Sequence, residues 1–468
     1  MLQIKKILSE EFGYHGEVVF IPHHLSHAAS SFYLSGYKKA TIVTLDGVGE
    51  WATTTLGFGQ CEKIKLDKEI RFPHSLGLLY STLTAYLGFK VNGDEYKVMG
   101  LAAYGNPEPF KPYFDKLITT YPDGSYALNM EYFDYTWSEH MPSKKMEVLF
   151  GHPTRLAESK IFQYHKDIAA SLQVKLEHTV FNLLNYAYKT YKTPNLCLAG
   201  GVALNSVMNG KILKNTSFKN VYIPPDPGDG GGAMGAALYT HFIKSTKNPN
   251  KDFFPYLGPE YEWYQVKSVL TKYKLKYKLY IHKTDLLNIV SIYLIQQKVV
   301  GWFQGRMEWG PRALGNRSIL ASALNERMKD IINAKVKKRE MFRPFAPVIL
   351  EEHVDNYFET NKQSLNLGKY MLTVIPFKER GKKKVPATVH VDGSGRLQII
   401  ARKDNPLYYD LIKTYMKKTG VPVIINTSFN VRGEPIVCTP EEAVNCFLST
   451  GIDVLIMDNY VVTKKNRD

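Results

Sequence analysis

Residues 196–205 read Leu-Cys-Leu-Ala-Gly-Gly-Val-Ala-Leu-Asn. The apolar run 196–199 has the length of a buried strand, and the two glycines after it mark a sharp turn into a helix. The same order returns at 221–232, where Val-Tyr-Ile precedes a turn rich in proline, aspartate and glycine. Strand, glycine turn and helix in alternation predict an α/β fold whose ligand sites lie at the carboxyl ends of the strands.

Similar patterns extend in both directions from this stretch. Hydrophobic periodicity predicts strands at 18–21, 40–45, 299–303, 348–350 and 421–425, and helices starting at 23 and covering 76–87 and 168–191. Residues 46–50 (Asp-Gly-Val-Gly-Glu) are expected to form the tight turn of a hairpin, and the lysines 382–384 beside Pro386 a loop. The run 245–250 is the best linker candidate, which divides the chain into domains at 1–250 and 258–468.

Composition excludes several classes of protein. The 468 residues are 44% hydrophobic and 13% aromatic, too rich for a disordered chain, and no apolar stretch could span a membrane. Four scattered cysteines form neither a disulfide framework nor a zinc ribbon, which favours a cytoplasmic location. The net charge is +16, but the basic residues are spread along the chain. We therefore favour a solvated basic surface over a nucleic-acid partner.

Two histidines four residues apart, His23 and His27, would face the same side of a helix and could share one metal ion. Asp46 and Asp229, which both follow predicted strands, are candidates for the remaining ligands. Such a mixed nitrogen and oxygen set suits iron, manganese or zinc. The alternative is that the histidines lie on the surface of a capped helix and that the two aspartates only support turns.

In the second part of the chain, lysines and arginines occur in short runs together with turn residues. Arginine forks bind phosphate and carboxylate groups bidentately, so these runs favour a small substrate carrying two negative charges. Salt bridges with Glu308 and Glu340 are the alternative for some of them. Asn426, Ser428 and Asn430 follow a predicted strand and could hydrogen-bond a nucleotide or phosphate, although a buried Asx turn would look similar. The arginine candidates are Arg306, Arg312, Arg317, Arg339, Arg343 and Arg396.

Many separate motifs, in the right order, resemble the O-carbamoyltransferase family that includes nodulation-factor, cephalosporin and aminoglycoside carbamoyltransferases. The resemblance runs through nearly the whole chain. It implies an actin-like ATPase fold for the first domain, similar to threonylcarbamoyl-transfer proteins, and a second α/β domain similar to threonylcarbamoyl-adenylate synthases. The motifs lie at residues 23–28, 46–50, 75–78, 95–102, 200–205, 228–230, 306–317, 343–347, 390–396 and 426–435.

The resemblance also implies the chemistry. The second domain would convert ATP, with magnesium, and carbamoyl phosphate to carbamoyl-adenylate, and the first would pass the carbamoyl group to a hydroxyl of a sugar, antibiotic or other small molecule. Lys337, Arg339 and Arg396 would be catalytic, and the remaining substrate ligands would be Arg306, Arg312, Arg317, Arg343, Asn426, Ser428 and Asn430. His23, His27, Asp46 and Asp229 would hold the metal. Gly200, Gly201, Asn205 and Gly228 would bind nucleotide in the first domain.

Members of that family begin with a further strand, loop and helix, which this chain lacks ahead of Glu17. We therefore expect a truncated chain, or a partner chain that supplies the segment. An unpaired sheet edge would favour self-association, for example as a homodimer. Two other functions stay open: a partial or non-catalytic subunit, and threonylcarbamoyl transfer to tRNA. A hydrogenase-maturation carbamoyltransferase fits less well, because its zinc-finger cysteine pairs have no counterpart here.

Overall fold

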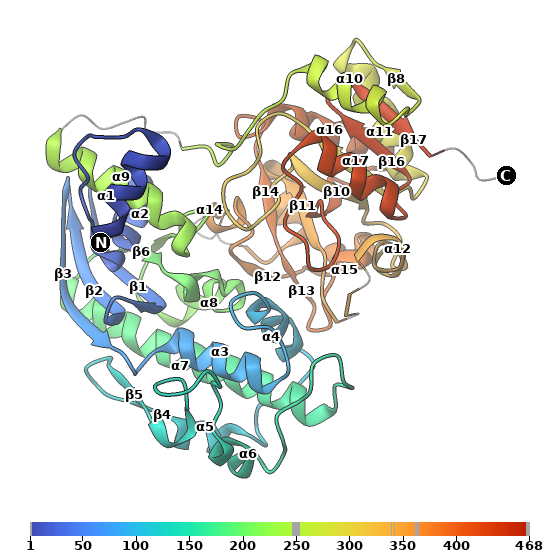
Figure 1. Ribbon diagram of the computed structural model, residues 1–468. Coiled ribbons are helices and arrows are strands. Elements are labelled where there is room, and N and C mark those ends of the chain that lie inside the picture. The colour runs from blue at the N-terminus through green and yellow to red at the C-terminus, as the bar shows by residue number, and fades with distance from the viewer. Residues whose placement is uncertain (1, 246–252, 338, 341, 361–364, 465–468) are drawn as a thin grey trace.

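The computed structural model describes residues 2–245, 253–337, 339–340, 342–360 and 365–464. Figure 1 shows two bodies side by side, which we name the first lobe (residues 2–245) and the second lobe (residues 253–464). Each lobe contains its own large β-sheet. The predicted linker at 245–250 falls almost wholly outside the described residues.

The first lobe is built on a five-stranded sheet in the order β3-β2-β1-β6-β7. β1, β2 and β3 pair antiparallel, whereas β6 and β7 run parallel to β1. A parallel pair needs a crossover through other elements, and α7 (Gln163–Tyr191) and α8 (Ser206–Asn215) lie in these crossovers. The strands are β1 (Lys39–Gly49), β2 (Ala52–Gln60), β3 (Lys63–Arg71), β6 (Asn195–Ala199) and β7 (Asn220–Tyr222).

Helices cover both faces of this sheet because successive side chains of β1 point to opposite sides. Ala40 and Ile42 pack with α2 (His23–Ser35), while Val43 and Leu45 pack with α3 (Leu76–Tyr86) and α7. Helix α9 (Asp229–Lys244) lies against α2. The other elements of the lobe are α1 (Leu2–Phe12), α4 (Glu95–Ala102), α5 (Lys111–Leu117), β4 (Ile118–Thr120), β5 (Tyr126–Leu128) and α6 (Lys144–Phe150).

The second lobe has a mixed eight-stranded sheet in the order β14-β11-β15-β10-β9-β16-β17-β8. One face packs against α10 (Trp263–Lys272) and α17 (Pro440–Ser449), and the other against α11 (Lys283–Ile295) and α16 (Pro406–Thr419). The strands are β8 (Tyr277–Leu279), β9 (Val300–Phe303), β10 (Arg317–Ser322), β11 (Ala346–Leu350), β14 (Gln398–Ile400), β15 (Val423–Ser428), β16 (Val454–Met457) and β17 (Tyr460–Thr463). Smaller elements are α12 (Met328–Ile332), α13 (Val354–Tyr357), α14 (Leu365–Gly368), β12 (Val374–Pro376), α15 (Glu379–Lys384) and β13 (Ser394–Arg396).

The predicted α/β class is confirmed, and most of the predicted strands and helices are present within one or two residues. Three local expectations were wrong. Residues 18–21 form no strand, because this segment has no sheet partner and Val19 and Phe20 stay 42% and 41% exposed. The lysines 382–384 form the last turn of α15, where cations face the negative end of a helix, and Pro386 follows it.

The third correction concerns Asp46, which lies within β1 and not in the hairpin turn. β1 continues to Gly49, and the turn falls at Glu50 and Trp51. The pairing with β2 is irregular between Leu45 and Gly49, so this stretch bulges out of the regular register. The Ser75 hydroxyl supports the bulge by donating to the carbonyl oxygens of Asp46 and Gly47, at 3.0 and 2.6 Å.

Among the described residues no helix has both the length and the apolar character needed to cross a membrane.

Candidate functional site

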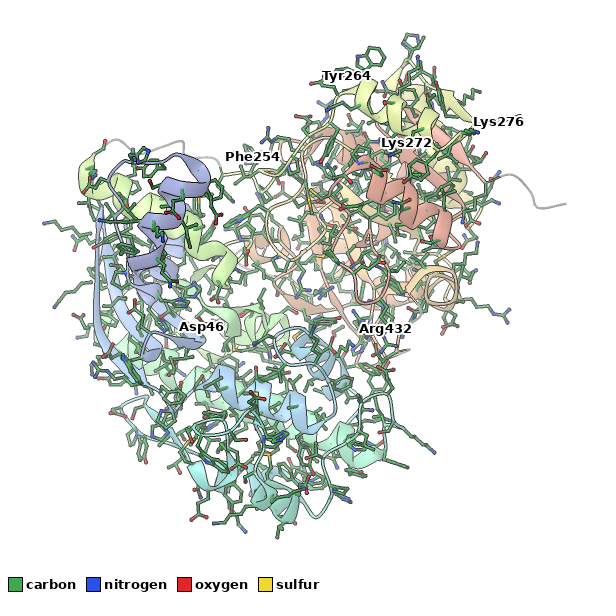
Figure 2. The ribbon with its side chains drawn as sticks, viewed as in Figure 1. Asp46, Phe254, Tyr264, Lys272, Lys276 and Arg432 are labelled. Atoms are coloured by element: carbon green, nitrogen blue, oxygen red, sulfur yellow. The ribbon has the colours of Figure 1, made fainter. Side chains whose placement is uncertain are left out.

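Four ligand-type side chains of the first lobe converge on one point. Donor atoms of His23, His27, Asp46 and Asp229 all lie within 4.8 Å of one another. His23 Nε2 is 2.8 Å and His27 Nε2 is 3.2 Å from Asp46 Oδ2, and the two Nε2 atoms are 3.0 Å apart. Asp229 Oδ1 is 3.6 Å from both imidazoles. We name this group the His–Asp cluster; Asp46 is labelled in Figure 2.

The fold brings these side chains together through two helix N-termini and one strand. The histidines occupy successive turns at the start of α2, and Asp229 is the first residue of α9. These helices cross closely because Gly235 has no side chain; a Cβ there would overlap the carbonyl oxygen of Ser26. Asp46 is fixed from its other side, since the Gly201 N–H donates to Asp46 Oδ1 at 2.9 Å.

The charges within the His–Asp cluster favour proton or metal binding. Burial opposes a charge on His27, but its hydrogen bonds to Asp229 and Asp46 outweigh this and raise the pKa of His27 to about 9. Burial would raise the pKa of Asp46, but both histidines hold it well below its ordinary value. In contrast, burial lowers the pKa of His24 to about 4. Both nitrogens of this ring are hydrogen-bonded elsewhere, to the Thr44 hydroxyl and to the carbonyl oxygen of Ala52. His24 is therefore not part of the cluster.

The donor set fits a divalent transition metal. Two imidazole nitrogens that approach to 3.0 Å while facing the same carboxylate oxygen are arranged as ligands of a common cation. The Nδ1 atom of His27 is buried without a hydrogen-bond partner, so nothing in the described residues fixes the tautomer of this ring. The four residues selected from the sequence as metal ligands thus come together in space.

A second site lies between the lobes, in a cavity of about 780 Å³. Its walls come from α4, α7 and α8 of the first lobe and from loops and strand ends of the second. Nine lysines and arginines line it against four aspartates and glutamates, counted over the described residues. Eight predicted residues line this cation cavity: Arg312, Lys337, Arg339, Arg343, Arg396, Asn426, Ser428 and Asn430.

Several of these cations are at least half-buried near one another, and the structure shows no ion pair for them within the described part of the chain. Among the described residues Arg312, Lys337, Arg339 and Arg396 form no ion pair, and the Nε atoms of Arg312 and Arg396 lack hydrogen-bond partners. Burial, followed by the charges of Arg312, Arg339 and Arg343, lowers the pKa of Arg396 far below its ordinary value. Burial and then Arg343 lower the pKa of Arg339 to about 9. Such a group is stabilised by an incoming anion.

Lys337 is held in the cavity wall by hydrogen bonds to the second lobe. It ends a single π-helical turn, Asn333–Lys337, and its Nζ donates to the carbonyl oxygens of Ser428 and Asn430 at 2.6 and 2.9 Å. It also approaches Asn430 Oδ1 at 2.7 Å and Ser428 Oγ at 3.3 Å. The strand predicted to end at residue 425 continues to Ser428 as β15, so Asn426 and Ser428 lie within it and not after it; Asn426 donates to Gln398 Oε1. Lys337 therefore holds the loop that presents Ser428 and Asn430.

Two predicted ligands lie outside the cavity. Arg317 is fully buried, with its guanidinium 3.7 Å from the Phe303 ring centre and bonded to the carbonyl oxygens of Gln304 and Gly305. Arg306 is exposed and bonds the carbonyl oxygen of Leu257. Glu308 accepts three backbone N–H groups of the loop that follows, and that loop carries Arg312 into the cavity. Of the three arginines in this motif, the structure places only Arg312 at the site.

The four predicted nucleotide ligands of the first lobe lie along the turn between β6 and α8 and at the start of α9. Gly200 has φ +93 and packs so tightly on the Leu45 carbonyl that a side chain would clash. Gly201 supports Asp46, and Gly228 is the N-cap of α9, next to Asp229. Asn205 caps α8 through Met208 and exchanges hydrogen bonds with Gln173, which lines the cavity.

The sequence reasoning missed the residues that join the lobes at the cavity. Lys97 on α4 contacts Glu340 of the second lobe at 3.3 Å, and Arg432 contacts Glu340 at 3.5 Å and also Glu158 of the first lobe. Figure 2 shows Arg432 where the second lobe faces the first. The motif at 95–102 was the available signal, since it carried the resemblance but no assigned role.

Family models and related proteins match nearly the whole chain. The family model "Carbamoyltransferase N-terminus" matches residues 4–238, and "Carbamoyltransferase C-terminus" matches residues 291–464. The protein sll1178 of Synechocystis sp. is 44% identical over 96% of this chain and 76% of its own length. Nodulation protein NolNO of Sinorhizobium fredii is 37% identical over 99% of this chain and 67% of its own length.

Among solved structures, full-length HypF in a phosphate- and nucleotide-bound form aligns with 41% of this chain and 23% of that chain. Its sequence identity is 18% and its TM-score 0.29, too low to transfer a fold or a site. The family models and the relatives that align with nearly all of this chain are decisive: this chain belongs to the carbamoyltransferase family and is a transferase.

Proposed function

We propose that this protein is an ATP-dependent O-carbamoyltransferase that forms carbamoyl-adenylate in the cation cavity and transfers its carbamoyl group to a hydroxyl of a small molecule or sugar. The observation that carries the proposal is the cluster of Arg312, Arg339 and Arg396, which is buried and lacks any carboxylate partner among the described residues. Carbamoyl phosphate and the triphosphate of ATP supply the anions that such a cluster stabilises.

Adenylate formation can be written in two balanced steps. Water takes the phosphoryl group of carbamoyl phosphate as inorganic phosphate, which leaves carbamate. A carbamate oxygen then attacks the α-phosphorus of magnesium-bound ATP, a new P–O bond forms, and pyrophosphate leaves. Arg339, Arg343 and Arg396 hold the phosphate oxygens during both steps, and their fixed charges offset the negative charge that builds up on them.

Transfer to the acceptor belongs in this proposal to the first lobe. The acceptor hydroxyl oxygen attacks the carbamoyl carbon, its proton passes to water, and AMP departs with the electrons of the broken C–O bond. His23, His27, Asp46 and Asp229 would hold a divalent metal, which supplies Lewis-acid charge when bound. Asp46 is kept ionised and in place by both histidines and by the Gly201 N–H.

The finer assignments belong to the same proposal. We infer an actin-like first domain at 1–250 and a second domain at 258–468 that resembles threonylcarbamoyl-adenylate synthases. The separate sheets of the two lobes support this division. Arg306 and Arg317 are left out of the substrate ligands because their side chains are occupied elsewhere. The cytoplasmic location and the partner chain stay predictions.

The decisive experiment is pyrophosphate release by the purified chain with ATP, magnesium and carbamoyl phosphate. We expect release that depends on carbamoyl phosphate and falls on the order of a hundredfold in Arg396→Ala, the scale of losing one fixed charge at a reacting phosphate. Arg402→Ala is the control, because Arg402 is an exposed arginine paired with Asp410. A folded wild-type protein that releases no pyrophosphate would contradict the proposal.

A further inference from the structure

Glu340 contacts three cations that line the cation cavity, Lys97, Arg343 and Arg432. It is a carboxylate, 17% exposed, on the loop that also supplies Arg339 and Arg343. Its Oε1 is 3.3 Å from Lys97 Nζ and 3.5 Å from Arg432 Nη2, and its Oε2 is 3.6 Å from Arg343 Nη1. Oε2 is buried and accepts no hydrogen bond among the described residues. This oxygen therefore lies near a substrate-binding arginine without being committed to it.

Lys97 occupies the opposite side of the same carboxylate. It belongs to α4 of the first lobe, is 7% exposed, and is also held by Asp94 Oδ1 at 2.9 Å. The same part of the first lobe contacts the loop at two further points: the Arg343 guanidinium lies 4.5 Å from the ring centre of Tyr96 on α4, and the rings of Phe342 and of Tyr104, just after α4, are 6.3 Å apart. The position of the first lobe thus determines where Glu340 is held.

We propose that Glu340 is an internal anion that competes with substrate phosphate for Arg343, and that Lys97 of the first lobe holds it away. The inference rests on the proposed phosphate site and adds a pair of residues that sets the affinity of this site for anions. With Lys97 in place, Arg343 is available to an incoming phosphate. When Lys97 is withdrawn, Glu340 loses its closest partner, turns to Arg343 and lowers the affinity of the cavity for anions. Lys97 and Glu340 are positioning residues, since both act through Arg343.

Variants that remove the charge of one partner distinguish this role from a purely structural contact between the lobes. If the pair only held the lobes together, removing either partner would weaken phosphate binding in the same direction. If Glu340 competes with phosphate, the two changes act in opposite directions. Lys97→Met should weaken binding by roughly tenfold, the scale of one charge-assisted contact, whereas Glu340→Gln should tighten it several-fold. The double variant should resemble Glu340→Gln, and Lys97→Arg should keep wild-type affinity.

The experiment is calorimetric titration of the whole chain with inorganic phosphate at low salt. Lys175→Met is the matched control, because Lys175 is a lysine of the first lobe that pairs with Asp115 away from the cavity. Weaker binding in Glu340→Gln, or no change in either variant, would overturn the inference while leaving the phosphate site intact. A wild-type chain that binds no phosphate would overturn the site itself. Glu340→Gln carries the test even if Lys97→Met fails to fold.

Discussion

The His–Asp cluster and the cation cavity are both charged, but only the first is balanced by its own residues. Two imidazoles face two carboxylates in the cluster, and the Gly201 N–H adds a further contact to Asp46. At the cavity, the carboxylate of Glu340 is shared among three of the cations that line it, Lys97, Arg343 and Arg432. A balanced cluster can exchange a proton for a metal ion without new partners, whereas an unbalanced one needs an anion from outside.

The strongest test of whether the two sites act independently is to remove a ligand of the His–Asp cluster. Asp46→Asn takes away the carboxylate that both histidines contact, so metal affinity should fall on the order of a hundredfold. Metal binding is measured by titration of chelator-treated protein. Phosphate binding in the cavity should not change, because no contact links Asp46 to the arginines. Asp67→Asn, an aspartate paired with Lys65 on β3, is the control. Loss of phosphate binding in Asp46→Asn would show that the sites are not independent.

A smaller effect is expected from changing the helix packing that holds the cluster. Gly235→Ala places a methyl group against the backbone of Ser26, so α2 and α9 must separate. The free energy of unfolding should fall by about 1–3 kcal/mol, and metal affinity should fall with it. Gly232→Ala lies on the same helix in open space and should be neutral or slightly stabilising. Chemical denaturation of both variants is the measurement, and equal stabilities would refute the packing argument.

As the pH falls, the first lobe should lose stability at a higher pH than the second lobe. His165 caps α7 by accepting the Phe162 N–H, and burial together with the charge of Arg155 lowers its pKa to about 4. Between the unfolded value of about 6.5 and 4, the unfolded chain binds a proton that the folded chain does not, so stability falls as pH decreases through this range.

This pH effect is the smallest of the three. His165→Gln should flatten it, because glutamine can make the same capping bond without titrating. The measurement is the thermal midpoint at pH 6.5, 5 and 4, compared between wild type and variant. A variant with an unchanged pH dependence would assign the effect to other groups.

The sequence was sufficient where a function depends on local order. His23 and His27 share a helix face because they are four residues apart, and the turn at 200–205 follows its strand as predicted. The sequence was insufficient where tertiary contacts determine which side chain reaches a site. Arg306, Arg312 and Arg317 look equivalent in sequence, and tertiary contacts determine which one reaches the cavity: Glu308 shapes the loop that carries Arg312, while Arg306 and Arg317 bond other carbonyl oxygens.

The first-lobe wall of the cavity was also beyond local reasoning. Lys97 and Glu340 are far apart in the chain, and no periodicity indicates that α4 meets the second lobe. The strand predicted at 18–21 failed for a related reason: strand propensity describes a residue's preference but does not supply a neighbouring strand.

The contacts of Lys337 have a consequence for how this sequence can change over time. Its ammonium group has three protons and is surrounded by four oxygen atoms of Ser428 and Asn430. An arginine would be too long for this space, and a methionine would leave buried carbonyl oxygens without a donor. We therefore expect positions 337, 428 and 430 to change together, because a substitution at one of them leaves hydrogen-bonding groups unsatisfied unless another compensates.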